Sequence, residues 1–183
     1  ITLIDTPGLL DPTGHKKDNE HEKNIVNAVA ALGVIHAILL VHKGSDSRQD
    51  AALGYLIGEF RTMLPKECKD NIVIVFTHTV NNLKIDALPA LRAMGIPTDK
   101  HFAFDNDCFA PSTAMRRFFR TEKAFELYQR KSKTQWESNE LIFDEFTELL
   151  PTLLPKNATL MKTLHTKKSV MFQMAYSFAD NLA

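Results

Sequence analysis

Three apolar runs dominate the hydrophobic pattern of the chain. Two nearly continuous runs cover Val34–Val41 and Ile72–Phe76, and a weaker run follows at His101–Phe104. Strand-length runs without polar alternation are typical of parallel strands that are covered on both faces. The pattern therefore predicts a mainly parallel sheet that contains these three strands.

Helical periodicity separates and follows the apolar runs. Ser47 opens a predicted helix that ends before Pro65, and further helices are predicted over Asn24–Leu32 and Leu83–Met94. A long amphipathic helix is predicted from the apolar spacing between Ile142 and Leu153, and the tail after it has a weaker helical pattern. Strands that alternate with helices indicate an α/β fold with flanking helices.

The first residues combine a strand pattern with a turn. Ile1–Ile4 is predicted to be the end of a buried strand, and Asp5, Thr6, Pro7 and Gly8 follow it. Phosphoryl-transfer proteins use a strand ending in Asp-x-x-Gly to hold Mg²⁺ and to present a glycine N–H to the terminal phosphate. The same residues also satisfy an ordinary type I or type II turn, so the motif alone decides nothing.

Polar clusters follow the other two predicted strands at their carboxyl ends. Thr77-His78-Thr79 comes after the second run, and Asp105-Asn106-Asp107 comes after the third. Ligands of open α/β sheets bind at the carboxyl ends of the strands. The order of a phosphate turn followed by two base loops favours a GTPase.

With these motifs in this order, the chain resembles the immunity-associated nucleotide-binding GTPases. This is the IAN/GIMAP or avirulence-induced-gene family, in the septin-like and Toc-like paraseptin group. The resemblance covers roughly residues 1–154 and rests on four segments, which are Asp5–Leu9 with Asp11, His36–Val41, Val75–His78 and Phe104–Asn106. It implies a P-loop GTPase-like α/β fold, with a partial G domain over residues 1–154 and a C-terminal helical extension or tail over 155–183.

The resemblance also implies ligands and site residues. The ligands are GTP or GDP with Mg²⁺. Asp5 is expected to reach Mg²⁺ through water and Gly8 to contact the γ-phosphate, and Thr6 is grouped with them as a residue that binds Mg²⁺ or phosphate. The guanine pocket is expected to be lined by Thr77, His78, Asp105 and Asn106, and no catalytic residue is assigned.

Two positions depart from the usual GTPase pattern. Thr77-His78-Thr79-Val80 has no acid where most GTPases accept the guanine N1–H and N2–H groups, at about 1.5–3 kcal/mol per bond. Asp105 is a plausible substitute acceptor, with His78 stacked on the base. Leu9 replaces the glutamine that orients water in Ras-like enzymes, so hydrolysis is expected to be slow or dependent on a partner.

A phosphate-cradling motif Gly-x-x-x-x-Gly-Lys-[Ser/Thr] does not occur in this sequence, which starts with Ile1. We therefore expect a fragment of a longer protein whose N-terminal part, with the first strands and the P-loop, is missing. Without that part, nucleotide binding is expected to be negligible and the strand at Val34–Val41 to have an exposed apolar edge.

Composition adds a few restrictions. The 22 basic and 22 acidic residues balance, so nothing points to a nucleic-acid partner, and the basic stretch Arg116–Lys133 is interpreted as a solvated helix face. Cys68 and Cys108 lack metal-ligand spacing, which favours packing in a reducing, cytoplasmic compartment. His15–Glu22 is predicted to be a mobile polar loop able to respond to a γ-phosphate.

The resemblance further implies a homodimer across the nucleotide face. It also implies membrane association at the cytosolic face, through a region outside this chain or at its end. Two alternatives stay open, namely a pseudo-GTPase interaction module and an α/β enzyme that uses Asp5 and His78 in unrelated chemistry. Nucleotide-dependent dimerisation excludes the first alternative, and activity independent of GTP and Mg²⁺ favours the second.

Overall fold

The computed structural model describes residues 2–6, 15–45, 58, 64–79, 85–109 and 115–180. The chain divides into two compact units. The first comprises Ile1–His36, Gln49–Asn71 and Pro155–Ala183, and the second comprises Ala37–Arg48 and Ile72–Leu154. The assignment of residues 1–154 to a partial G domain and 155–183 to a tail stays a prediction.

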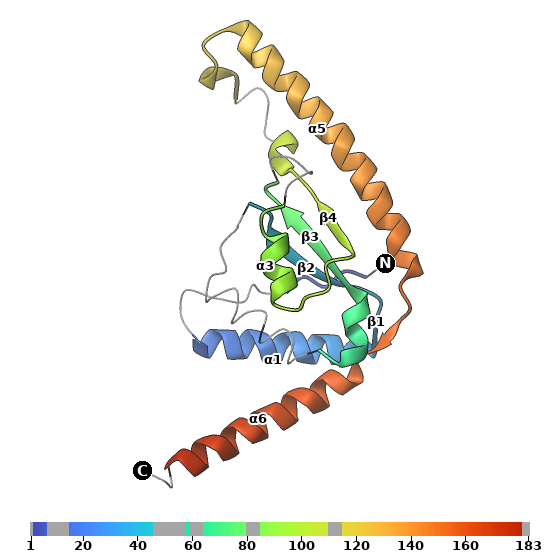
Figure 1. Ribbon diagram of the computed structural model, residues 1–183, viewed down its shortest axis with the longest axis vertical. Helices are drawn as coiled ribbons and strands as arrows, with labels where there is room; N and C mark the ends of the chain where they lie inside the picture. Colours follow the sequence, from blue (N-terminus) through green and yellow to red (C-terminus); the bar gives the residue numbers. More distant parts are fainter. Residues whose placement is uncertain are drawn as a thin grey trace. The chain divides into compact units, whose positions relative to one another are not determined.

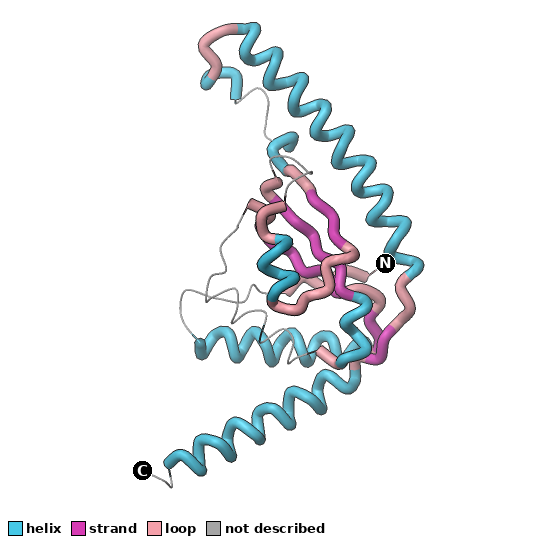
Figure 2. The backbone as a smooth tube through the Cα atoms, viewed as in Figure 1, coloured by secondary structure: helices cyan, strands magenta, loops and turns pink. Residues whose placement is uncertain are grey.

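A three-stranded parallel sheet forms the centre of the second unit (Figure 2). Its strands are β2 (Ile38–Lys43), β3 (Ile72–Thr77) and β4 (His101–Ala103), in the order β2-β3-β4. Ile38 of β2 pairs with Ile72 of β3. The predicted α/β class with a parallel sheet is confirmed for this unit.

β3 provides the core of the second unit because it has a neighbouring strand on each side. Ile72, Val73, Ile74 and Phe76 are buried. Among the described residues, α5 (Glu122–Leu149) packs along the β4 side of the sheet, and α3 (Leu88–Ala93) begins next to Gly44, whose carbonyl accepts the Ala87 N–H (Figure 1). The continuous apolar run of β3 is therefore explained by cover on both faces.

The predicted strand over residues 34–41 is wrong in two respects. It is split into β1 (Val34–Ile35) and β2, and burial along β2 alternates instead of being continuous. Val41 is 63% exposed although it shares a face of the sheet with Phe102 of β4. The ring of Phe102 meets that of Phe146 on α5 edge to face, at 5.3 Å between centroids, so α5 covers this face at β4, two strands away from Val41.

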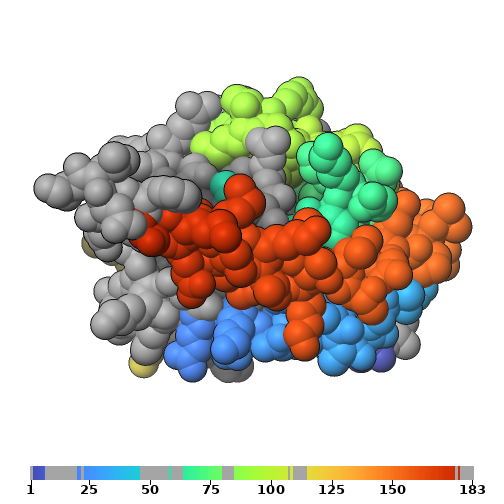
Figure 3. All heavy atoms as spheres, turned by 90° about the horizontal axis from the view of Figure 1, so that it is seen from below, coloured from blue at the N-terminus to red at the C-terminus, as the bar shows by residue number. Residues whose placement is uncertain are grey.

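The described part of the first unit contains two long helices and a short ladder. α1 (His15–Leu32) and α6 (Thr159–Asp180) lie side by side, as Figure 3 shows from below. β1 pairs antiparallel with β5 (Lys156–Asn157). Gly33 connects α1 to β1 at a φ of 76°, a left-handed conformation that glycine adopts without a steric penalty. Its carbonyl accepts a hydrogen bond from the Ala158 N–H at 2.9 Å.

Two expectations for the first unit are wrong. His15–Glu22 is the first part of α1 and not a loop, because the stretch has no Gly or Pro and runs directly into the periodic segment that follows. Thr2–Thr6 lie outside any strand or helix and are exposed, so the predicted opening strand is not formed. A strand needs a pairing partner, and no ladder in the described residues includes this segment.

The remaining elements are short turns and the C-terminal helices. 3₁₀ turns occur at η1 (Lys66–Asn71), η2 (Asn106–Phe109), η3 (Arg116–Phe118) and η4 (Leu150–Thr152). α5 begins at Glu122, inside the basic stretch Arg116–Lys133, and is much longer than the helix predicted between Ile142 and Leu153. The helical pattern predicted for the tail is confirmed by α6. Across the part of the chain that the structure describes, each helix is too short or too polar to traverse a bilayer.

The predicted helix from Ser47 to Pro65 lies almost entirely outside the described residues. The predicted helix over Leu83–Met94 is confirmed only over α3, Leu88–Ala93. Residues 85–87 are described and not helical, and residues 80–84 lie outside the described residues.

Candidate functional site

The carboxyl ends of the three parallel strands are held side by side by two backbone hydrogen bonds. Gly44, which follows β2, donates its N–H to the carbonyl of Thr77 at 2.7 Å. Phe104, which follows β4, donates its N–H to the carbonyl of Phe76 at 2.8 Å. The polar residues that follow β3 and β4 therefore leave the sheet from neighbouring positions, where ligands of parallel sheets bind.

His78 directly follows β3 and has a left-handed conformation, with a φ of 54°. Among residues other than glycine, histidine is one of those enriched there. Its Nδ1 lies 3.1 Å from the Thr77 hydroxyl, and the side chain is exposed. The turn thus places an aromatic ring in solvent at the carboxyl edge of the sheet.

Gly44 and Thr79 pack against each other on the buried side of this turn. Sequence reasoning did not predict that either residue supports the turn. Thr79 is 2% exposed. A Cβ on Gly44 would lie 2.4 Å from Cγ2 of Thr79, closer than van der Waals contact allows. The carbonyl of Gly44 also accepts a hydrogen bond from the Ala87 N–H at 3.3 Å, which ties the strand ends to the start of α3. A glycine directly after an apolar strand was the available signal.

Asp105 and Asn106 follow β4 and differ in exposure. Asp105 is 7% exposed, whereas Asn106 is exposed at the start of η2. The carbonyl of Asp105 accepts a hydrogen bond from Nδ2 of Asn139 on α5 at 2.8 Å. Sequence reasoning also missed Asn139. This residue lies 34 positions after Asp105, on a strongly charged helix, and no local motif marks it.

The phosphate-side residues belong to the first unit. Asp5 and Thr6 are exposed, and Gly8 lies outside the described residues. The structure thus brings Thr77, His78, Asp105 and Asn106 to one sheet edge in the second unit. Within the described ranges, no group of three or more His, Cys, Asp or Glu side chains is arranged to hold a metal ion.

Two groups among the described residues, Cys68 and Asp99, have shifted pKa values. Burial raises the pKa of the Cys68 thiol, the charge of Glu67 adds to the increase, and Lys156 opposes it. The pKa of Asp99 is lowered by a hydrogen bond from its own backbone and by Lys100, whose Nζ lies 3.3 Å from its carboxylate. Neither group belongs to the candidate site.

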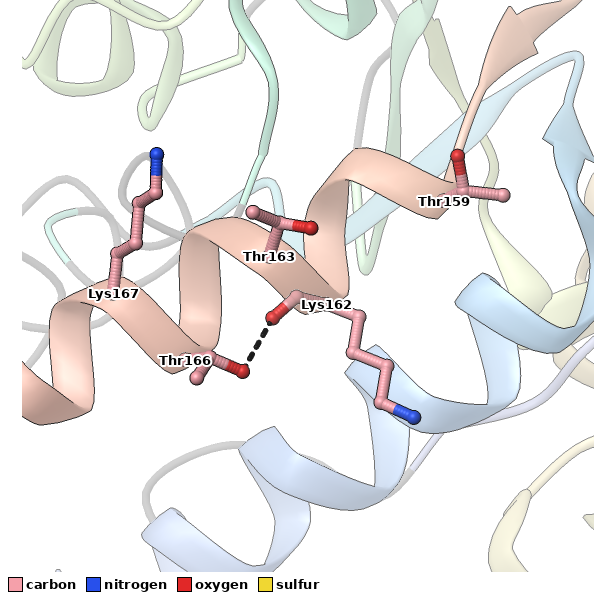
Figure 4. A pocket seen from close by; sticks show the side chains of 5 residues that line it. All are labelled: Thr159, Lys162, Thr163, Thr166 and Lys167. Carbon is pink, nitrogen blue, oxygen red and sulfur yellow. Dashed lines mark hydrogen bonds between the residues drawn. The ribbon is translucent and has the colours of Figure 1, made fainter.

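A surface hollow lies on α6 and is unrelated to the sheet edge (Figure 4). Lys162 and Lys167 extend away from each other, so their charges do not converge on a ligand. The hydroxyl of Thr166 donates to the carbonyl of Lys162 at 2.9 Å, as is common within helices. None of the residues predicted to bind nucleotide lines this hollow, which is formed by Thr159, Lys162, Thr163, Thr166 and Lys167.

Comparison with known proteins links the chain to one GTP-binding protein. It is 31% identical over 78 residues to GTP-binding protein A of Dictyostelium discoideum. The matched segment covers 43% of this chain and 17% of that protein's length. No family model and no solved structure matches the chain.

Proposed function

We propose that the second unit carries the guanine-reading side of a GTP-binding switch domain of the immunity-associated, IAN/GIMAP type. The observation that carries this proposal is the hydrogen bond from the Phe104 N–H to the Phe76 carbonyl at 2.8 Å. It sets Thr77-His78 and Asp105-Asn106 at adjacent strand ends, as two base loops require. The similarity to GTP-binding protein A supports the same ligand class.

Three of the base-side residues have proposed tasks that follow from their exposure. The exposed His78 ring stacks on the base, and the exposed Asn106 amide borders the pocket. Asp105 accepts the guanine N1–H and N2–H groups in place of the acid that is absent from the Thr77 loop. Its burial favours such a bond, because a charge-assisted hydrogen bond is stronger where water is excluded.

The phosphate side is proposed to use Asp5 and Mg²⁺. Mg²⁺ retains several waters and is commonly held by one or two carboxylates together with substrate phosphates. The exposed carboxylate of Asp5 fits a contact through water. When bound, Mg²⁺ neutralises charge on the phosphates. The loop that cradles them would come from a longer chain, since its motif does not occur in this sequence.

The same proposal includes the switch behaviour expected of this family. Hydrolysis is slow or partner-dependent, and two copies associate across the nucleotide face when GTP is bound, at the cytosolic face of a membrane. Sedimentation of the full-length protein with GTP, with GDP and without nucleotide tests the association. An assembly state that does not respond to nucleotide would contradict this part and favour a pseudo-GTPase.

The deciding experiment is a base-discrimination assay on the full-length protein that contains this chain. Asp105→Asn preserves size and backbone bonds but removes the charged acceptor, and the GTP-to-ATP affinity ratio is expected to fall about tenfold or more. Asp99→Asn, which changes an exposed carboxylate in the same unit, is the matched control and leaves the ratio unchanged. A wild-type protein without guanine preference, or an unchanged ratio in Asp105→Asn, would contradict the proposal.

A further inference from the structure

The side chain of Asn139 is a buried polar group in the second half of the long helix α5. It is 7% exposed, whereas the neighbouring Glu140 is exposed. A buried amide is costly unless its donors and acceptor are satisfied, because the hydrogen bonds it made with water are lost. The Asn139 amide is therefore expected to have hydrogen-bond partners inside the protein.

The Asn139 amide bonds the backbone of Asp105 in both directions. Its Nδ2 donates to the Asp105 carbonyl at 2.8 Å, and its Oδ1 accepts from the Asp105 N–H at 3.4 Å. A neighbouring β-strand would offer a residue the same donor and acceptor pair. Asn139 thus continues the support of β4 beyond the point at which the sheet ends.

The neighbours of Asn139 define which way its amide faces. Gln135, one turn earlier on α5, donates from Nε2 to Oδ1 at 3.3 Å. The second Nδ2 hydrogen is directed at Sγ of Cys108, at 3.4 Å, and this thiol lies 3.5 Å from the Asp105 carbonyl. The backbone of Asp105 fixes this orientation, because the flipped amide would set Nδ2 against the N–H and Oδ1 against the carbonyl.

We propose that Asn139 is a positioning residue that holds the Asp105-Asn106 segment in place for reading guanine. The inference rests on the proposed function and deepens it. Asn139 acts through the backbone of Asp105 and does not touch the base. It therefore affects discrimination between guanine and adenine, whereas binding of the triphosphate, which is common to both nucleotides, is unaffected.

The test uses Asn139→Ala and Asn139→Asp in the full-length protein. Asn139→Asp has nearly the same shape but replaces the Nδ2 donor by an oxygen that faces the Asp105 carbonyl. Both variants are expected to lower the GTP-to-ATP affinity ratio about tenfold or more, while affinity for inorganic triphosphate with Mg²⁺ stays at the wild-type value. Glu140→Gln, which changes the adjacent exposed residue of α5, is the matched control and retains the wild-type ratio.

A second readout follows the loop without any nucleotide. Maleimide labelling of Cys108 is expected to speed up several-fold in both variants, because Asn139 no longer holds the loop and the thiol against α5. Buried Cys68 is the internal reference for the reagent. If a variant fails to fold in a thermal unfolding scan, Gln135→Ala takes its place. That substitution removes one of the two donors to Oδ1 of Asn139, and a smaller change in both readouts is expected.

The outcomes separate the two proposals. Guanine preference in the wild type that persists in the Asn139 variants overturns the positioning role and leaves the proposed function standing. Unchanged Cys108 labelling also overturns the positioning role. A wild-type protein without guanine preference overturns the proposed function, and the inference that rests on it is then withdrawn as well.

Discussion

The side chain of Thr79 occupies the space in which a side chain on Gly44 would begin, with Cγ2 only 2.4 Å from the position of such a Cβ. Gly44→Ala is therefore expected to destabilise the second unit by about 1–3 kcal/mol, the usual cost of overpacking a filled site. Thr79→Ser removes the clashing methyl, so the double variant should recover part of the loss. Urea unfolding of the single and double variants measures both effects.

Gly58→Ala is the matched control for this prediction, since a Cβ on Gly58 meets nothing within 4 Å. If Gly44→Ala unfolds at the same urea concentration as the wild type, the close packing of Thr79 against Gly44 does not restrict the side chain at position 44, and the prediction is wrong.

His78 allows conformation to be separated from binding. Glycine adopts a φ of 54° freely, whereas a β-branched residue there is strained, so His78→Gly should be about 1–2 kcal/mol more stable than His78→Val. Both variants lose the ring proposed to stack on the base, so both should bind GTP more weakly than the wild type. Calorimetric melting of each variant and nucleotide titration of the full-length protein provide the two measurements. A GTP affinity unaffected by His78→Gly would remove the stacking role.

Because Cys68 is buried, we expect the folded protein to lose stability at alkaline pH. Its pKa is raised in the folded protein because burial disfavours the thiolate. The contribution of the protonated Cys68 thiol to the free energy of unfolding is fully present below the thiol's pKa in the unfolded chain, about 8.5. This contribution is lost as the pH rises through the raised pKa of the folded protein. Cys68→Ala is expected to unfold more easily at neutral pH but to show a flatter alkaline dependence than the wild type. Cys108→Ala is the control, and an equal alkaline slope in all three proteins would argue against the prediction.

Thr121 caps the start of α5 through its hydroxyl, which accepts the Ala124 N–H at 3.2 Å. Thr121→Ala is expected to cost about 1 kcal/mol of stability, whereas Thr121→Ser keeps the cap and should cost less. Thermal unfolding distinguishes the two. Equal losses in both variants would mean that the methyl group of Thr121, and not its hydroxyl, stabilises the helix.

The parts of the fold predicted from the sequence are those specified by local pattern. The run at Ile72–Phe76 is buried on both faces and reads as a strand from its composition alone. The polar residues after β3 and β4 reach one edge because parallel strands end together. Their position at that edge is confirmed, and their role in guanine binding stays a prediction.

The parts that were missed depend on partners distant in sequence. The apolar residues of β2 look the same as those of β3, but α5 meets the sheet at β4 and Val41 is exposed. The polar start of α1 carries no apolar periodicity to reveal its helix. Asn139 acquires its importance from a residue 34 positions away, which no local spacing indicates.

β2 pairs along one edge only, as far as the described residues extend. In a parallel ladder, alternate residues direct their N–H and C=O groups toward the neighbouring strand, and the others direct them away. The outward groups of β2 then keep their hydrogen bonds with water. In hydrogen–deuterium exchange, amides along this strand should therefore alternate between slow and fast, so that the division between protein-bonded and water-bonded backbone changes at every residue.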